Sequence, residues 1–140
     1  MRYFIVFLAV LGCVYADTPA NCTYEDVQGM WIFDMGSREH GSSLKCDSPA
    51  SFEKVSSLRV NLLFPNLAID EFGNKGFWTL IYNQGFEVVI HGRKFFAFSD
   101  FQKEGKNVTS ICDRTKPGLS HNVLERDWAC FQGHKLEPPL

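Results

Sequence analysis

Apolar and polar residues alternate along much of this chain with a period of two. Between positions 55 and 64, Leu58, Val60 and Leu62 are apolar and are separated by arginine and asparagine. Side chains at alternate positions of a β-strand point to opposite faces, so this spacing predicts a strand with one buried face. Residues 77–90 predict a β-hairpin, because two stretches of β-branched and aromatic residues flank the turn sequence Asn83-Gln84-Gly85.

Further strands are predicted along the rest of the chain, at spacings of roughly 8 to 14 residues with turn residues between them. They are expected at residues 30–33, 94–101, 108–112 and 127–132. Residues 122–126 are compatible with one helical turn. No repeat or interdomain linker interrupts the series, and the chain has the length of one domain. The pattern predicts an all-β fold, an antiparallel up-and-down β-barrel of about eight strands.

The first sixteen residues have the pattern of a signal peptide. Arg2 provides a positive charge, residues 3–14 are apolar, and Val14-Tyr15-Ala16 suits a cleavage site. An apolar stretch of about 12 residues is short of the about 20 that span a bilayer. We therefore predict a signal peptide at residues 1–16 and a mature chain that begins at Asp17. The expected destination is the secretory pathway, with the protein either lysosomal or secreted.

Composition narrows the possible partners. The chain is 45% hydrophobic and 21% charged, with a formal net charge of −2, as in an ordinary globular protein. No run of lysine or arginine exceeds two residues, so no nucleic-acid-binding surface is predicted. Neither does the sequence predict a membrane partner.

The cysteines and sequons fit an extracellular or lysosomal environment. Cys13 lies in the predicted signal peptide, and four cysteines remain, an even number that predicts two disulfides. Spacing alone leaves three pairings open. The four cysteines are Cys22, Cys46, Cys112 and Cys130. Asn21 and Asn107 each begin an N-x-S/T sequon and are predicted glycosylation sites.

No pattern of catalytic or metal-binding residues stands out. Ser120 and His121 are neighbours, but the G-x-S-x-G sequence of many hydrolases is missing, and we expect residues 118–121 to form a surface loop. The four histidines have no metal-ligand spacing. Asp70 and Glu71 are adjacent carboxylates that a turn over residues 70–74 explains. We therefore predict no catalytic residue and no metal site.

Gly29-Met30-Trp31 has the G-x-W form found near the start of lipocalins. Lipocalins are eight-stranded barrels that enclose an apolar ligand, so a lipocalin-like carrier is one hypothesis for the function.

Several stretches together resemble another family, the cathepsin C (dipeptidyl peptidase I) family, in the region called its exclusion domain. In chain order these stretches are residues 17–24, 29–31, 81–89, 94–98 and 128–131. The resemblance runs over residues 17–135. Residues 136–140 are then expected to be a tail, the start of a linker or propeptide.

The resemblance implies a β-barrel that precedes a propeptide and a papain-like cysteine protease domain. It implies disulfides Cys22–Cys112 and Cys46–Cys130. It also implies that Asp17 binds the amino terminus of the substrate while the barrel blocks the cleft beyond the second subsite. The implied partners are the heavy and light chains of the protease domain, peptide substrates with free amino termini, and further copies in a homotetramer. The family's chloride ion is expected in the protease domain, outside this chain.

Three hypotheses for the function therefore remain. The first is the exclusion domain of a lysosomal cysteine dipeptidyl aminopeptidase, in a sequence that has no papain-type catalytic cysteine and is expected to hydrolyse nothing alone. The second is a stand-alone secreted protein that binds or inhibits papain-like proteases. The third is the lipocalin-like carrier.

Overall fold

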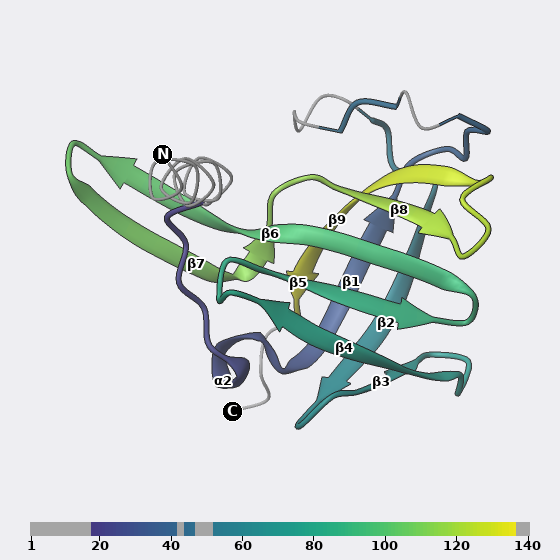
Figure 1. Ribbon diagram of the computed structural model, residues 1–140, viewed down its shortest axis with the longest axis horizontal. Helices are drawn as coiled ribbons and strands as arrows, with labels where there is room; N and C mark the ends of the chain where they lie inside the picture. The colour runs from purple at the N-terminus through teal and green to yellow at the C-terminus, as the bar shows by residue number, and fades with distance from the viewer. Residues whose placement is uncertain (1–17, 42–43, 47–51, 137–140) are drawn as a thin grey trace, which may run out of the picture.

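Nine strands and one short helix make up most of the part of the chain that the computed structural model describes, which is residues 18–41, 44–46 and 52–136 (Figure 1). In chain order they are α2 (Tyr24–Val27), β1 (Gly29–Met35), β2 (Ser56–Leu63), β3 (Leu67–Asp70), β4 (Lys75–Ile81), β5 (Gly85–Ile90), β6 (Arg93–Glu104), β7 (Asn107–Thr115), β8 (Gly118–Asn122) and β9 (Trp128–Lys135). No helix in these ranges is long and apolar enough to span a membrane.

Eight of the strands close into a ring. Strands β1 to β6 pair with one another in sequence order, β6 then pairs with β8, β8 with β9, and β9 with β1. Every pairing is antiparallel. The predicted all-β barrel of about eight strands is therefore confirmed, with β7 as an additional strand outside the ring.

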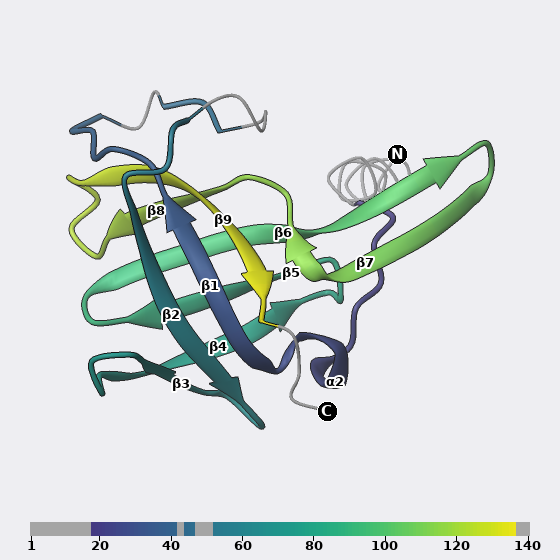
Figure 2. The same ribbon diagram turned by 180° about the vertical axis from the view of Figure 1, so that it is seen from behind.

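The position of β7 follows from the length of β6, which has 12 residues. Its first part, from Arg93 to Phe96, pairs with β8 inside the ring. Its last part, from Ser99 to Glu104, pairs instead with β7, and the register shifts between Ser99 and Asp100. The β6–β7 hairpin consequently extends beyond the barrel wall, as the views from both sides show (Figures 1 and 2).

Aromatic side chains fill the interior of the barrel. Trp31, Phe33, Phe86, Phe95 and Phe131 are all at most 2% exposed. Their ring centroids lie 4.9 Å apart for Trp31 and Phe86, and 5.1–5.2 Å apart among the three phenylalanines 33, 95 and 131. A carrier of the lipocalin type needs this space for its ligand, so the packing argues against the carrier hypothesis.

Two local predictions are wrong. Residues 118–121 belong to strand β8 and not to a surface loop, because β6 and β9 pair with this segment on its two sides. Residues 122–126 contain no helix, because Asn122 ends β8 and residues 123–127 connect β8 to β9. Strand β3 was not predicted either. The predicted hairpin at residues 77–90 is confirmed as β4 and β5.

Two disulfides link distant parts of the chain. Cys22, just before α2, is bonded to Cys112 in β7, and Cys46, in the loop after β1, is bonded to Cys130 in β9. These are the pairs that the family resemblance implies. The predicted signal peptide, Asp17 and residues 137–140 of the predicted tail lie outside the described residues.

Candidate functional site

The first described residues run along the outside of the barrel next to the projecting hairpin (Figure 1). We call residues 18–23 the N-terminal segment. Asp17, the predicted substrate-binding residue, directly precedes this segment and is not itself among the described residues. The structure therefore shows how the chain after Asp17 is held.

Two elements that are distant in sequence hold the N-terminal segment. The backbone N–H of Cys22 donates to the carbonyl of Asn83 in the β4–β5 turn at 2.7 Å. The N–H of Asn21 donates to Oγ of Ser110 in β7 at 2.9 Å, and Nδ2 of Asn83 donates to Oδ1 of Asn21 at 3.2 Å. The disulfide to Cys112 adds a covalent link to the same strand. The segment is thus fixed at Asn21 and Cys22, four and five positions after Asp17.

Helix α2 continues this attachment into the end of the barrel. A capping box starts the helix: Asp26 N–H donates to Oγ1 of Thr23 at 3.3 Å, and Thr23 N–H donates to the Asp26 carboxylate at 2.9 Å. At the other end, Nε1 of Trp31 donates to the Val27 carbonyl at 2.7 Å. Cys22 and Val27 are fully buried, so the N-terminal segment and the helix close one end of the barrel.

The projecting part of the β6–β7 hairpin is polar and exposed. Residues 102–109 are all exposed, and Gly105, with φ of 59°, makes the turn at the tip. Ser110 and Cys112 contact the N-terminal segment, so they mark one face of β7, and alternation places Asn107, Thr109 and Ile111 on the other face. The hairpin therefore has one face toward the N-terminal segment and one face directed away from it.

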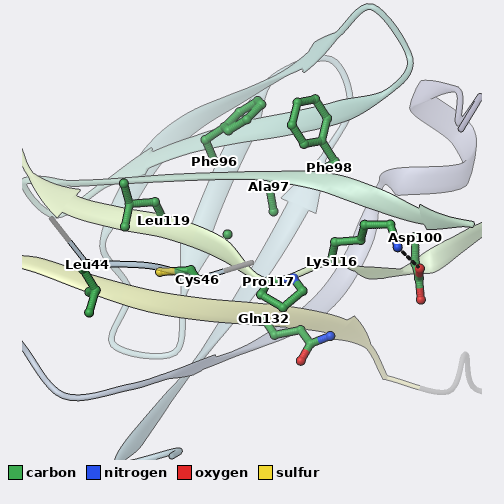
Figure 3. A pocket seen from close by; sticks show the side chains of 11 residues that line it. Leu44, Cys46, Phe96, Ala97, Phe98, Asp100, Lys116, Pro117, Leu119 and Gln132 are labelled. Carbon is green, nitrogen blue, oxygen red and sulfur yellow. Dashed lines mark ion pairs between the residues drawn. The ribbon is translucent and has the colours of Figure 1, made fainter. Parts of the chain in front are cut away.

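An apolar groove of about 510 Å³ lies beside the root of the hairpin. Figure 3 shows that β6, the stretch from Lys116 to Leu119 and the chain near Leu44 contribute its walls. Nζ of Lys116 pairs with Asp100 at 3.3 Å and lies 4.5 Å from the centre of the Phe101 ring. The lining residues described include no histidine and no free thiol, and the amine of Lys116 is paired with Asp100.

Ser120 and His121 do not form a catalytic pair. Ser120 is fully buried, and its Oγ accepts a hydrogen bond from Nε of Arg93. His121 Nδ1 lies 2.7 Å from the carbonyl of Asn122, and neighbouring strand residues point to opposite faces. Burial lowers the pKa of the Arg93 guanidinium, as does the nearby charge of Arg38, while Asp127 opposes the change.

Asp70 has a structural role in the predicted turn over residues 70–74. Its Oδ1 accepts the N–H groups of Phe72 and Asn74, each at 2.9 Å, and its Oδ2 accepts from Nδ2 of Asn74 at 2.9 Å. Burial alone raises the pKa of this carboxyl, but the hydrogen bonds from Asn74 and Phe72 outweigh burial and hold the pKa below its usual value. The adjacent Glu71 accepts instead from the N–H of Arg59.

Neither metal binding nor thiol chemistry is indicated in the part of the chain described. No group of three or more metal-ligating side chains occurs there. All four cysteines of residues 18–136 are in disulfides. Both sequon asparagines, Asn21 and Asn107, are exposed.

Sequence reasoning missed the residues that hold the N-terminal segment. Ser110 and Asn83 carry no local signal for this role, because they meet Asn21 only after the barrel closes, 89 and 62 positions away. Both strands of the projecting hairpin were predicted, at residues 94–101 and 108–112, but nothing in their sequence marks where β6 leaves the ring.

Comparison with known proteins identifies relatives of the whole described domain. A family model described as cathepsin C exclusion domain matches residues 17–135. Cathepsin C from Schistosoma mansoni is 43% identical over 120 residues, which is 86% of this chain and 24% of that protein. The chain therefore spans about a quarter of the length of this relative.

Proposed function

This chain belongs to the cathepsin C exclusion-domain family, and from that premise we propose that it limits a papain-like cysteine protease domain to removing dipeptides. A papain-like cleft accepts extended peptides on both sides of the bond that is cut. A dipeptidyl enzyme needs a barrier beyond the second subsite and an anion that pairs with the substrate's terminal ammonium. The barrel with its projecting hairpin supplies the barrier, and Asp17 supplies the anion.

The observation that carries this proposal is the fixation of the N-terminal segment against the hairpin. Four peptide units separate Asp17 from Asn21, which is held by Ser110 and Asn83, so Asp17 is confined to within about 14 Å of that point. A confined carboxylate loses less entropy on binding a cation than a free terminus does. Its charge-assisted hydrogen bond to an ammonium is stronger than a neutral one.

The projecting hairpin suits the role of a barrier. Its exposed residues 102–109 contribute no side chain to the barrel core, so their length serves no evident purpose in folding. A peptide that extends past the second subsite would meet this hairpin and would also lack the ammonium that Asp17 pairs with. The steric block and the missing ammonium both weaken the binding of longer peptides. Specificity therefore comes from repulsion as well as from attraction.

The remaining parts of the proposal concern the environment of the protein. The partner is a papain-like protease domain with heavy and light chains, assembled as a homotetramer and located in the lysosome or secreted. We further propose that Asn21 and Asn107 carry glycans. A glycan on Asn107 would project from the face of the hairpin that points away from the N-terminal segment, and would leave the Asp17 side open.

The test uses residues 17–135 joined to the protease domain of a cathepsin C, as the native domain or with Asp17→Asn. Two fluorogenic dipeptide amides are compared, one with a free amino group and one N-acetylated. A charged hydrogen bond contributes about 1.5–3 kcal/mol, so Asp17→Asn should lower kcat/KM for the free amine by roughly 10- to 100-fold.

The acetylated substrate is the matched control, because it has no ammonium for Asp17 to bind. Its kcat/KM should be low with the native domain and should not fall further with Asp17→Asn. Amino-terminal sequencing of both proteins verifies that the mature chain begins at position 17. Equal activity of the two proteins on the free amine would show that Asp17 is not the anchor.

A further inference from the structure

A second cavity opens at the end of the barrel opposite α2. We call it the barrel mouth; it lies between the β3–β4 turn, the β5–β6 turn and the β8–β9 turn, and its volume is about 540 Å³. Met35, Leu58, Ile90 and Phe95 form its apolar floor. Cavities of about 300–1,000 Å³ with an apolar lining and a few polar groups are typical of small-molecule sites.

Two arginines and one aspartate stand at the rim of the mouth. Arg93 has a side chain that is only 10% exposed, and its Nη1 lies 3.5 Å from Oδ2 of Asp127. Nη1 of Arg38 lies 2.8 Å from the same oxygen. The other oxygen of Asp127, Oδ1, is buried and has no hydrogen-bond partner in the described part of the chain. One carboxylate oxygen is therefore shared by two guanidinium groups.

This sharing leaves hydrogen-bond donors free. A guanidinium group has five N–H donors, and a single carboxylate oxygen occupies few of the ten that Arg38 and Arg93 carry together. Arg93 uses two further groups on Ser120, through Nε to the hydroxyl and Nη2 to the carbonyl. The Arg38 side chain is 60% exposed, so its remaining donors are accessible from the cavity.

The other titratable groups at the mouth are Asp70 and His91. Asp70 adds a second negative charge to that of Asp127. Its carboxylate already accepts three hydrogen bonds from Phe72 and Asn74. The two aspartates, Asp70 and Asp127, balance the two arginines in charge. An anion would therefore be held by the free guanidinium donors that face it and not by an overall positive field.

We propose that the barrel mouth binds a small organic anion, a carboxylate with an apolar tail. The carboxylate accepts hydrogen bonds from Arg38 and Arg93, in the planar two-point geometry that guanidinium favours. The tail lies on the floor formed by Met35, Ile90 and Phe95. This site is at the opposite end of the barrel from the N-terminal segment, so it is independent of the proposed role of Asp17.

The experiment uses the secreted product of the full 140-residue sequence and two probes of the same shape. 3-Phenylpropanoate carries the carboxylate, and 3-phenylpropanamide is its neutral counterpart. Binding is measured by titration calorimetry at constant ionic strength. We expect saturable binding of the anion and at least about tenfold weaker binding of the amide, as expected for loss of a charged hydrogen bond. Absence of saturable binding, or equal affinity for both probes, would overturn the proposal.

Variants locate the site. Arg38→Gln should weaken binding of 3-phenylpropanoate about tenfold. Arg126→Gln is the control, because Arg126 is an exposed arginine of the neighbouring turn that does not line the mouth. Unchanged affinity in Arg38→Gln, or an equal loss in Arg126→Gln, would place the anion elsewhere and refute the site.

A second pair of variants changes the charge without removing a native contact. Ser56 is exposed and lines the mouth. Ser56→Glu should repel the carboxylate probe and weaken its binding, whereas Ser56→Gln, with nearly the same volume, should weaken it much less. Equal effects of the two substitutions would mean that bulk and not charge governs the site, contrary to the proposal. Circular dichroism verifies that each variant is folded.

Discussion

The disulfide between Cys22 and Cys112 holds two Cα atoms 5.7 Å apart although 90 positions separate them in the sequence. It joins the N-terminal segment to the strand of the hairpin that leaves the barrel. The N–H of Asn21 also donates a hydrogen bond to Ser110 on the same face of β7. The disulfide therefore joins β7 to a segment that this hydrogen bond already orients. The position of the chain next to Asp17 therefore depends on both contacts.

Removing this disulfide should lower stability and free the N-terminal segment. Chain entropy assigns a loop of this length roughly 4 to 5 kcal/mol, so we expect the double variant Cys22→Ser, Cys112→Ser to lose about 2–5 kcal/mol in denaturant unfolding. Hydrogen exchange at the amide of Asn21 should become faster.

The double variant Cys46→Ser, Cys130→Ser opens a loop of similar size, with 84 positions between the cysteines, and is the control. It should lose similar stability but leave that amide protected, and faster exchange in both variants would contradict the assigned role.

Shortening the hairpin should change specificity and not folding. We expect replacement of residues 102–109 by a two-residue Asn-Gly turn to change the free energy of unfolding by less than about 1 kcal/mol, because these residues are exposed. In the fused enzyme, cleavage of internal peptide bonds should appear, measured with a peptide blocked at its amino terminus. Lys103→Gln with Lys106→Gln keeps the length and alters only the charge. If the charge variant cleaved internal peptide bonds to the same extent as the shortened variant, the hairpin would not act as a steric barrier.

The two arginines at the barrel mouth should differ in their effect on stability. Arg93→Met removes the donor to the buried Ser120 hydroxyl and should cost about 1–3 kcal/mol. Arg38→Gln removes an exposed ion pair with Asp127 and should cost less than about 1 kcal/mol. Urea unfolding of both variants measures the difference. If Arg38→Gln lowered the free energy of unfolding more than Arg93→Met, the buried network around Arg93 would not be the source of the stability.

Asp70 should make stability depend on acidic pH. Its pKa in the folded chain is lowered, so the folded state binds fewer protons than the unfolded state near the ordinary aspartate pKa of about 3.9. The stabilisation is complete above that value and is lost as pH falls through the lower folded pKa. Asp70→Asn should therefore flatten the fall in urea midpoint between about pH 5 and pH 2. Asn74→Ala, which removes one donor, should give an intermediate slope, and an unchanged slope in both would refute this assignment.

The strands that the sequence predicts correctly are those with local signals. Residues 77–90 contain β-branched and aromatic residues around a turn sequence, and these features act within a few residues of one another. Leu58, Val60 and Leu62 alternate in the same way, and the structure buries Val60 and Leu62 fully. The interior-facing positions of a strand can be recognised before its partners are known.

Strand β8, which was missed, has no such signal. The sequence of β8, Gly-Leu-Ser-His-Asn, is polar and begins with glycine, and it is a strand because β6 and β9 satisfy its backbone on both sides. Gly118 is needed there because a Cβ would collide with the carbonyl oxygen of Phe96. Ser120 is buried because Arg93 provides a donor. These requirements arise only between strands.

Alternation, turn residues and the four cysteines that follow the predicted signal peptide were sufficient to predict an all-β barrel with two disulfides, because each is a property of neighbouring residues or of composition. Three features required the folded chain: the exit of β6 from the ring after Ser99, the fixation of Asn21 by Ser110, and the shared oxygen of Asp127 at the barrel mouth. Each of them joins residues that the register of the closed sheet brings together from distant positions. The free energy that selects this register comes from the packing of the whole core, which no short stretch of sequence contains.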